Sequence, residues 1–313
     1  MTGAGAIEIV DPGLLVTVQD LGRAGHAHLG VPRSGAADLP AHRLANALVG
    51  NDAGAATLEA TATGCELRVT APTVVAVTGA RCDVWVGHVP APFAAPVRLA
   101  AGQSLALGPA QRGLRSYVAV RGGVDAAAVL GSRATDTLSG LGPAPLRAGD
   151  VVALGSTAHA DDAEFARLRR IAVDAHVSRE GGHGDGRGGV RGDRDGDAAI
   201  VLDIAPGPRA EWFAPDALAR LCAQTYIASS DSDRIGLRLM GTPIERARLG
   251  ELPSEGMVLG AVQVPPSGQP VVFLADHPTT GGYPVVGVVD AAGVAAAAQT
   301  RPGDAVRFAA LEP

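Results

Sequence analysis

"PVVFLADHPTTGGYPVVGVVD" spans residues 270–290 and carries the pattern that decides the fold. Two valine-rich runs flank a polar stretch, and both have the β-branched composition and the length of strands. A plain chain reversal needs a glycine and at most one proline. The acid, histidine, two threonines, two glycines and tyrosine between the runs exceed that need, so this stretch is expected to form either an elaborate loop or a binding site.

The same strand composition recurs along the chain. Short valine-rich segments bounded by glycine or proline lie at 73–79, 83–87, 116–123 and 199–207. In "RIGLRLMG" (234–241), Ile235, Leu237 and Leu239 alternate with arginines, which predicts a strand with one apolar face. Helices are expected only over 38–51, with Asp38 as N-cap and Gly50 as the stop, over 161–177, and after Pro215. We therefore predict a mainly β protein.

The length of 313 residues allows two ordinary domains or one large domain. Residues 178–198 are glycine and charge with almost no apolar side chain, so they cannot bury enough surface to offset their ordering entropy. An Arg-x-Gly-Asp turn begins at Arg147 and again at Arg301, each before a final strand, which is weak evidence for duplication. We expect an N-terminal domain over residues 1–177, a linker or loop over 178–198 and a C-terminal domain over 199–313.

Composition excludes several kinds of chemistry. All 26 basic residues are arginine, so a Schiff-base lysine, a Walker A lysine and a biotinylated lysine are absent from this polypeptide. The net charge of −6 and 3% aromatic residues argue against nucleic-acid binding. There is no apolar stretch of membrane-spanning length and no secretory signal, which predicts no membrane partner and a cytoplasmic location.

Neither the cysteines nor the histidines indicate a metal site. Cys65, Cys82 and Cys222 are scattered and odd in number, which is typical of buried thiols in a reducing compartment. The pair His26-x-His28 has no matching carboxylate-histidine cluster. The alternating aspartates at 193–197 lack the glycine and the closing glutamate of a calcium loop.

Four stretches are more polar than packing requires: 18–38, 120–142, 229–236 and 252–284. Arginine forks bind carboxylates and phosphates, and glycine pairs let backbone N–H groups approach an anion closely. For any single residue, a cap or a turn is an equally good interpretation. Four such stretches together favour a small-molecule site.

Specific sequence blocks now point to a family. "DPGLLVTVQDLGRAGHAHLGVPRSGAAD", "ANALVGNDAGAATLEAT", "YVAVRGGVD", "LGSRATDTLSGLG", "SDSDRIGLRLMG", "ELPSEGMVLGAVQVPPSGQPVVFLADHPTTGGYP" and "AQTRPGDAVRF" occur in order over nearly the whole chain. They resemble the signature blocks of the KipA-like family, whose members are also described as C subunits of 5-oxoprolinase, as allophanate hydrolase subunit 2 or as biotin-dependent carboxyltransferases. Ala37 departs from the family's usual methionine, and the charged insertion before residue 200 is a second departure.

The resemblance implies two tandem cyclophilin-like β-barrel domains. It also implies the A and B subunits of 5-oxoprolinase as partners, the second of them KipI-like, with ATP and Mg shared in a complex that opens 5-oxoproline to L-glutamate. A second interpretation is the carboxyltransferase component of a biotin-dependent urea or amide carboxylase, with biotin on another chain. The third is a KipA-like regulatory protein that binds a kinase inhibitor.

On this basis we expect three sets of site residues. The predicted catalytic set is Asp231, Arg234, Asp276 and Thr280. The predicted substrate or nucleotide contacts are Arg121, Ser132, Ser254, Gln263, Thr279, Gly281, Gly282 and Tyr283. The weaker candidates, which could instead form a subunit interface, are Asp20, Arg23, Ser34 and Asp38. Arg121 and Arg234 would clamp an anion, Asp231 or Asp276 would serve as a general base or metal partner, and the glycine pair would supply backbone donors.

Overall fold

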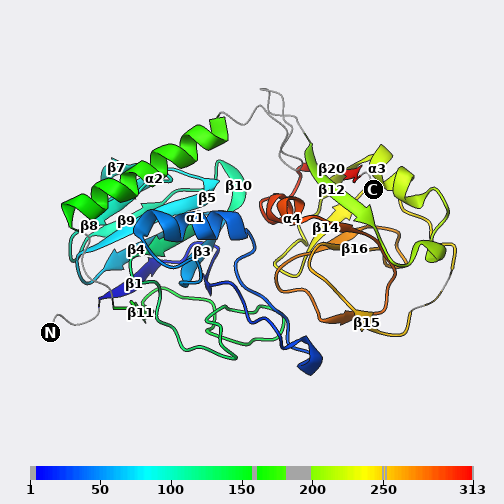
Figure 1. Ribbon diagram of the computed structural model, residues 1–313, viewed down its shortest axis with the longest axis horizontal. Coiled ribbons are helices and arrows are strands. Elements are labelled where there is room, and N and C mark those ends of the chain that lie inside the picture. Colours follow the sequence, from blue (N-terminus) through cyan, green and yellow to red (C-terminus); the bar gives the residue numbers. More distant parts are fainter. Residues whose placement is uncertain (1–4, 157–160, 181–198, 249, 251, 312–313) are drawn as a thin grey trace. The chain divides into compact units, whose positions relative to one another are not determined.

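The computed structural model describes residues 5–156, 161–180, 199–248, 250 and 252–311 (Figure 1). The chain divides into two compact units, each with its own hydrophobic core. The first comprises Met1–Arg23, Asp38–Asp136 and Gly140–Asp185, and the second comprises Ala24–Ala37, Thr137–Ser139 and Gly186–Pro313. The second unit thus takes in two short segments that the expected boundaries place in the first domain.

The first unit is built from two antiparallel sheets. The six-stranded sheet has the order β11-β1-β4-β9-β6-β7, with bounds Val151–Ala153, Ala6–Asp11, Cys65–Val69, Ser104–Leu107, Val84–Val86 and Val89–Ala91. The five-stranded sheet has the order β2-β3-β10-β5-β8, with bounds Leu15–Gln19, Thr57–Thr61, Arg112–Val120, Thr73–Arg81 and Val97–Leu99. Alternating side chains such as Ile7 and Ile9 of β1 and Val118 and Val120 of β10 are buried in one core.

The second unit is a closed barrel of seven strands in the order β12-β19-β16-β17-β14-β13-β20. Their bounds are Ile200–Pro206, Val285–Val289, Ala261–Gln263, Val271–Phe273, Gly236–Met240, Thr225–Ala228 and Ala305–Ala310. β12 and β20 pair in parallel and close the barrel, which leaves no open sheet edge in it. A separate ladder joins β15 (Glu255–Gly256) to β18 (Thr280–Gly281). The mainly β prediction is confirmed, with the closed barrel in the second unit and paired sheets in the first.

The predicted strand at 234–241 is confirmed as β14. Leu237 and Leu239 are buried in the barrel core, while Arg238 and Met240 are exposed. Arg234 precedes the strand and is buried, although the alternation places it on the polar face with Arg238. Its burial follows from an ion pair described below, which no periodicity can indicate.

The structure contains helices α1 (Leu39–Val49), α2 (Asp162–Glu180), α3 (Ala217–Ala223) and α4 (Ala291–Ala298), and the short 3₁₀ turns η1 (Ala27–Leu29) and η2 (Ala210–Trp212). The predicted caps of α1 are confirmed: the Asp38 side chain accepts from Ala41 N at 3.0 Å, and Gly50 is left-handed with φ 73°. The alanine-rich α4 is not expected from the sequence.

Helix α2 overlaps the start of the segment expected as a linker or loop. α2 continues to Glu180, so residues 178–180 of the expected segment are helical. Residues 181–198 lie outside the described part of the chain.

The two Arg-x-Gly-Asp turns have the same geometry. Asp150 Oδ2 accepts from Arg147 N at 2.7 Å, and Asp304 Oδ2 accepts from Arg301 N at 2.8 Å. The glycine in each turn is left-handed, with φ of 89° at Gly149 and 91° at Gly303. Strands β11 and β20 follow directly. The matching turns in the two units support a duplicated origin.

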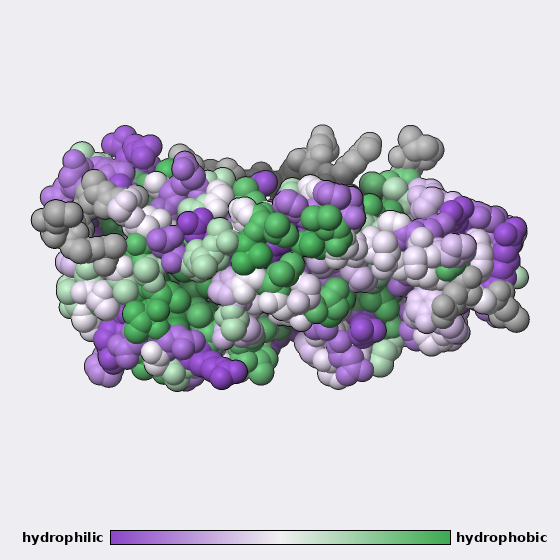
Figure 2. All heavy atoms as spheres, turned by 90° about the horizontal axis from the view of Figure 1, so that it is seen from below, coloured by the Kyte–Doolittle hydropathy of each residue, from purple (hydrophilic) through white to green (hydrophobic). Residues whose placement is uncertain are grey.

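Most large apolar side chains lie in the two cores. Exposed exceptions include Leu14, Leu29, Val89 and Val151, and Figure 2 shows hydrophobic side chains in separate patches on the face drawn. Scattered exposure of this kind is normal in folded proteins. None of the helices in the described segments is long and apolar enough to cross a bilayer.

Candidate functional site

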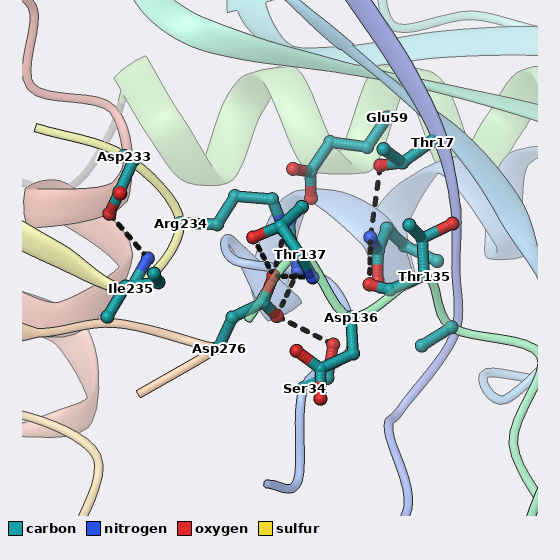
Figure 3. Close-up of polar contacts among 12 residues, drawn as sticks. Thr17, Ser34, Glu59, Thr135, Asp136, Thr137, Asp233, Arg234, Ile235 and Asp276 are labelled. Carbon is teal, nitrogen blue, oxygen red and sulfur yellow. Dashed lines mark hydrogen bonds and ion pairs between the residues drawn. The ribbon is translucent and has the colours of Figure 1, made fainter. Parts of the chain in front are cut away.

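A buried ion pair holds the start of the polar stretch 275–284. Arg234 precedes β14 and Asp276 follows β17, and these strands pair antiparallel with Gly236 opposite Phe273. The guanidinium therefore meets the carboxylate in a two-point contact, with Nε to Oδ2 at 2.9 Å and Nη2 to Oδ1 at 3.1 Å (Figure 3). The Asp276 side chain is fully buried and the Arg234 side chain is 2% exposed.

Two distant segments complete the cluster within the second unit. Ser34 Oγ donates to Asp276 Oδ1 at 2.6 Å, and Thr137 donates to Oδ2 from its backbone N at 2.9 Å and from Oγ1 at 2.7 Å. Arg234 Nη2 also donates to Gly35 O at 2.5 Å. Ser34 has a left-handed φ of 55°, which is uncommon for a residue with a side chain and marks a constrained position.

Asp276 is therefore held as an anion. Burial alone would raise its pKa, but the Arg234 guanidinium and the donors on Ser34 and Thr137 outweigh that effect and lower the pKa below its usual value. Five donated hydrogen bonds occupy its two oxygens. This arrangement suits a positioning carboxylate better than a general base or a metal ligand, because little lone-pair capacity remains.

Gln263 holds the far end of the same stretch. Its Nε2 donates to Tyr283 O at 3.0 Å and lies 4.0 Å from Met257 Sδ. Gln263 closes β16 at a register shift between β16 and β19, and such irregularities re-aim side chains at strand ends. Thus Asp276 fixes one end of the polar stretch and Gln263 the other.

The middle of the stretch forms strand β18, which pairs with β15 in a two-stranded ladder. Glu255 lies opposite Gly281, and Gly256 lies opposite Thr280. Backbone bonds from Met257 N to Thr279 O at 2.9 Å and from Leu252 N to Gly282 O at 2.8 Å extend the contact. The predicted residues at 279–283 and Gln263 are thereby brought together, with Thr280 exposed and Thr279 and Tyr283 half-buried.

Gly281 lies close to the side chains of Gln263 and Met257, which would have to shift to make room for a larger residue. A Cβ there would lie 2.8 Å from Gln263 Nε2 and 3.2 Å from both Cγ and Sδ of Met257. Gly282 is also close to its neighbour, since a Cβ would lie 3.2 Å from Leu252 O. Gly281 thus approaches the Gln263 amide closely, while Gly282 approaches the backbone at Leu252.

Two predicted residues of the second unit lie outside these clusters. Asp231 is exposed, and its carboxylate makes no hydrogen bond among the described residues. Ser254 is exposed as well. Their types and positions in polar stretches carry no information about burial, which is why the sequence could not separate them from Asp276.

In the first unit, Arg121 has a local structural role. Its Nη1 donates to Val49 O at 3.0 Å, and its Nη2 pairs with Glu164 Oε1 at 2.8 Å. It thereby ties the last turn of α1 to α2, which is favourable because helix C-terminal carbonyls lack intrahelical partners. These contacts occupy the guanidinium that the sequence analysis assigns to an anion.

The other first-unit candidates organise loops. Asp20 accepts from Ser132 Oγ at 2.6 Å and from Arg133 N at 2.6 Å. Arg23 is buried, donates to Ala134 O at 2.5 Å and has Nη1 4.0 Å from Asp136 Oδ2. Asp38 is the α1 cap already described.

Sequence reasoning missed Thr137 and His277. Thr137 belongs to the block "LGSRATDTLSGLG", but nothing there distinguishes it from Thr135. His277 Nδ1 lies 2.8 Å from Pro278 O, and its ring stacks on Phe273 with centroids 5.7 Å apart. Burial lowers the pKa of His277, which favours the neutral imidazole. Its position beside Asp276 is the signal that could have identified it.

Comparisons with known proteins cover nearly the whole chain. The chain is 34% identical over 312 residues to the C subunit of 5-oxoprolinase from Escherichia coli strain K12, covering 96% of this chain and 90% of that protein. It is 30% identical to the urea amidolyase of Saccharomyces cerevisiae, covering 98% of this chain but 17% of that protein.

Solved structures also resemble this chain over nearly its whole length. TTHA0988 matches with a TM-score of 0.81 at 34% identity, and this chain covers 56% of it, a little over half its length. The K. lactis urea amidolyase matches with a TM-score of 0.83 at 26% identity, with 19% of that chain covered. The model of the carboxyltransferase domain, subdomains A and B, matches residues 29–310. With the fold and the clusters above, these matches show that the chain belongs to the carboxyltransferase domain (subdomain A and B) family.

Proposed function

We propose that the chain is the C subunit of an ATP-dependent 5-oxoprolinase, a hydrolase that opens the cyclic amide 5-oxoproline to L-glutamate. The observation that carries this proposal is coverage: the match takes in 90% of the C subunit of Escherichia coli 5-oxoprolinase but 17% of the Saccharomyces cerevisiae urea amidolyase. The A and B subunits of the enzyme, the second of them KipI-like, would be its partners, and the activity would need all three.

The chemistry of the substrate explains why such a complex would use ATP. A five-membered lactam is a resonance-stabilised amide, and phosphorylation of its oxygen would make the ring carbon open to attack by water. The described residues include no group of three His, Cys, Asp or Glu side chains that could hold a metal ion. We assign ATP and Mg to a site shared with the partner subunits, as the family resemblance implies.

This chain would contribute substrate positioning. The stretch 275–284 is fixed at both ends and carries three hydroxyl groups, on Thr279, Thr280 and Tyr283, that are not fully buried. Hydroxyls and backbone donors held in place by a rigid shell can orient a small polar amide. The Arg234–Asp276 pair supplies that rigidity.

Reconstitution tests the proposal. The purified chain, mixed with the A and B subunits, is expected to release ADP in a 5-oxoproline-dependent reaction that yields glutamate, whereas the chain alone is expected to be inactive. A complex that folds and assembles but releases no ADP with 5-oxoproline would overturn the proposed function.

The family match favours one other function, carboxyl transfer to urea or another amide. Biotin would then be carried by a different chain, because this one has no lysine. Transfer of CO2 from a carboxylated biotin carrier to urea, measured with labelled bicarbonate, distinguishes this function from the first.

A further inference from the structure

Gln263 has the features of a residue that recognises an amide group through a hydrogen bond. It is a polar residue with only 8% of its surface exposed, and it lies at the end of barrel strand β16. Its side chain contacts the polar stretch 275–284. A buried amide of this kind normally satisfies both its donor and its acceptor. The hydrogen-bond partners of its two polar atoms, Nε2 and Oε1, therefore indicate the role of this side chain.

The orientation of the amide is fixed by its one strong contact. Nε2 lies 3.0 Å from Tyr283 O, and a backbone carbonyl can only accept a hydrogen bond. The amino group must therefore face Tyr283, and Oε1 must face the opposite way. Oε1 has no hydrogen-bond partner among the described residues, and it is not one of the fully buried unpartnered atoms.

The surroundings hold this acceptor in place. Gly281 passes so close that a Cβ would lie 2.8 Å from Gln263 Nε2, and Met257 lies on the same side. The β15–β18 ladder keeps Gly281 at that distance. The amide is thus a pre-positioned acceptor beside Gly281 and Tyr283.

We propose that Gln263 Oε1 accepts the N–H of the amide substrate, and so selects substrates whose amide nitrogen is unsubstituted. This inference rests on the proposed function for the identity of the substrate class. A lactam or urea offers an N–H donor beside its carbonyl, whereas a carboxylate or ester does not. A glutamate at this position could not donate to Tyr283 O and would add a buried charge, which accounts for glutamine.

The test compares 5-oxoproline with its N-methyl derivative, which has no N–H donor. The reconstituted complex would be assayed for ADP release, to give KM and kcat, and for direct binding of each compound by calorimetry. The wild type is expected to prefer 5-oxoproline by about tenfold or more, the value of one hydrogen bond. Gln263→Ala removes the acceptor and leaves space for the methyl group, so the preference is expected to collapse to about one.

A matched pair of glycine variants separates this role from folding. Gly281→Ala would displace the amide and is expected to reduce the preference in the same direction. Gly256→Ala, on the partner strand of the same ladder, has no atom within 4 Å of its added Cβ and is expected to leave the preference unchanged.

The outcomes distinguish the two proposals. If the wild type binds the two compounds equally or binds neither, or if Gln263→Ala keeps the wild-type preference, the role of Gln263 is overturned. If binding shows the preference and its loss in Gln263→Ala while the wild type releases no ADP, the role of Gln263 stands and the 5-oxoprolinase function fails.

Discussion

At the scale of single residues, the charge on Asp276 is the feature with the largest expected effect. Asp276→Asn leaves the buried Arg234 guanidinium without its counter-charge, and a broken buried pair costs roughly 3–5 kcal/mol. The free energy of unfolding in urea measures this loss. Asp231→Asn, at an exposed carboxylate with no described hydrogen bond, is the control and is expected to change the value by about 0.5 kcal/mol or less.

The same pair predicts a pH dependence. The pKa of Asp276 is lower in the folded state than the unfolded value of about 3.9, so the folded state favours the anion. Its stabilisation is fully present above the unfolded pKa and is lost as pH falls through the lower folded pKa. The stability difference between wild type and Asp276→Asn should therefore shrink below about pH 4. A difference that stays constant down to about pH 2 would contradict this account.

The burial of His277 predicts a second effect of pH on stability, in a different pH range. Burial lowers its pKa below the unfolded value of about 6.5, so the unfolded chain binds the proton more readily. Stability is expected to fall as pH drops below that value, and His277→Asn should reduce the slope of unfolding free energy against pH. The exposed His28 offers the matched histidine substitution, His28→Asn, for comparison.

At the scale of elements, the two Arg-x-Gly-Asp turns should respond alike. Gly149 and Gly303 are left-handed, and an added Cβ at either meets no atom within 4 Å. Alanine there is strained only through its backbone, so Gly149→Ala and Gly303→Ala are each expected to cost about 1–2 kcal/mol in thermal unfolding. Gly256→Ala, which has neither a left-handed φ nor a close neighbour, should cost less than either. Clearly unequal costs at the two turns would argue against shared geometry.

At the scale of the whole molecule, the second unit depends on segments from early in the chain. Residues 24–37 and 137–139 belong to it and bring Ser34 and Thr137 to Asp276. A fragment of residues 199–313 lacks these donors, and each hydrogen bond to a charged group contributes about 1.5–3 kcal/mol. We expect the fragment to unfold at a markedly lower temperature than the intact chain by circular dichroism. A fragment with the stability of the full chain would show that these contacts matter little.

Local features of this protein could be predicted from its sequence because they depend on neighbouring residues. Valine-rich runs identified the strands, Asp38 and Gly50 identified the ends of α1, and the Arg-x-Gly-Asp turns were recognisable in both units. The sequence blocks shared with the family identified the segments that contain the candidate site. Each of these signals lies within a short stretch of chain.

Only the tertiary structure decided which polar residues meet. The pairing of β14 with β17 places Arg234 beside Asp276, 42 residues away, and the chain path brings in Ser34 from 242 residues away. The same long-range packing gives Arg121 a helix terminus and Glu164 as partners instead of an anion, and leaves Asp231 in solvent. Burial and pairing set the charge state of a carboxylate, and both arise only when distant segments pack together.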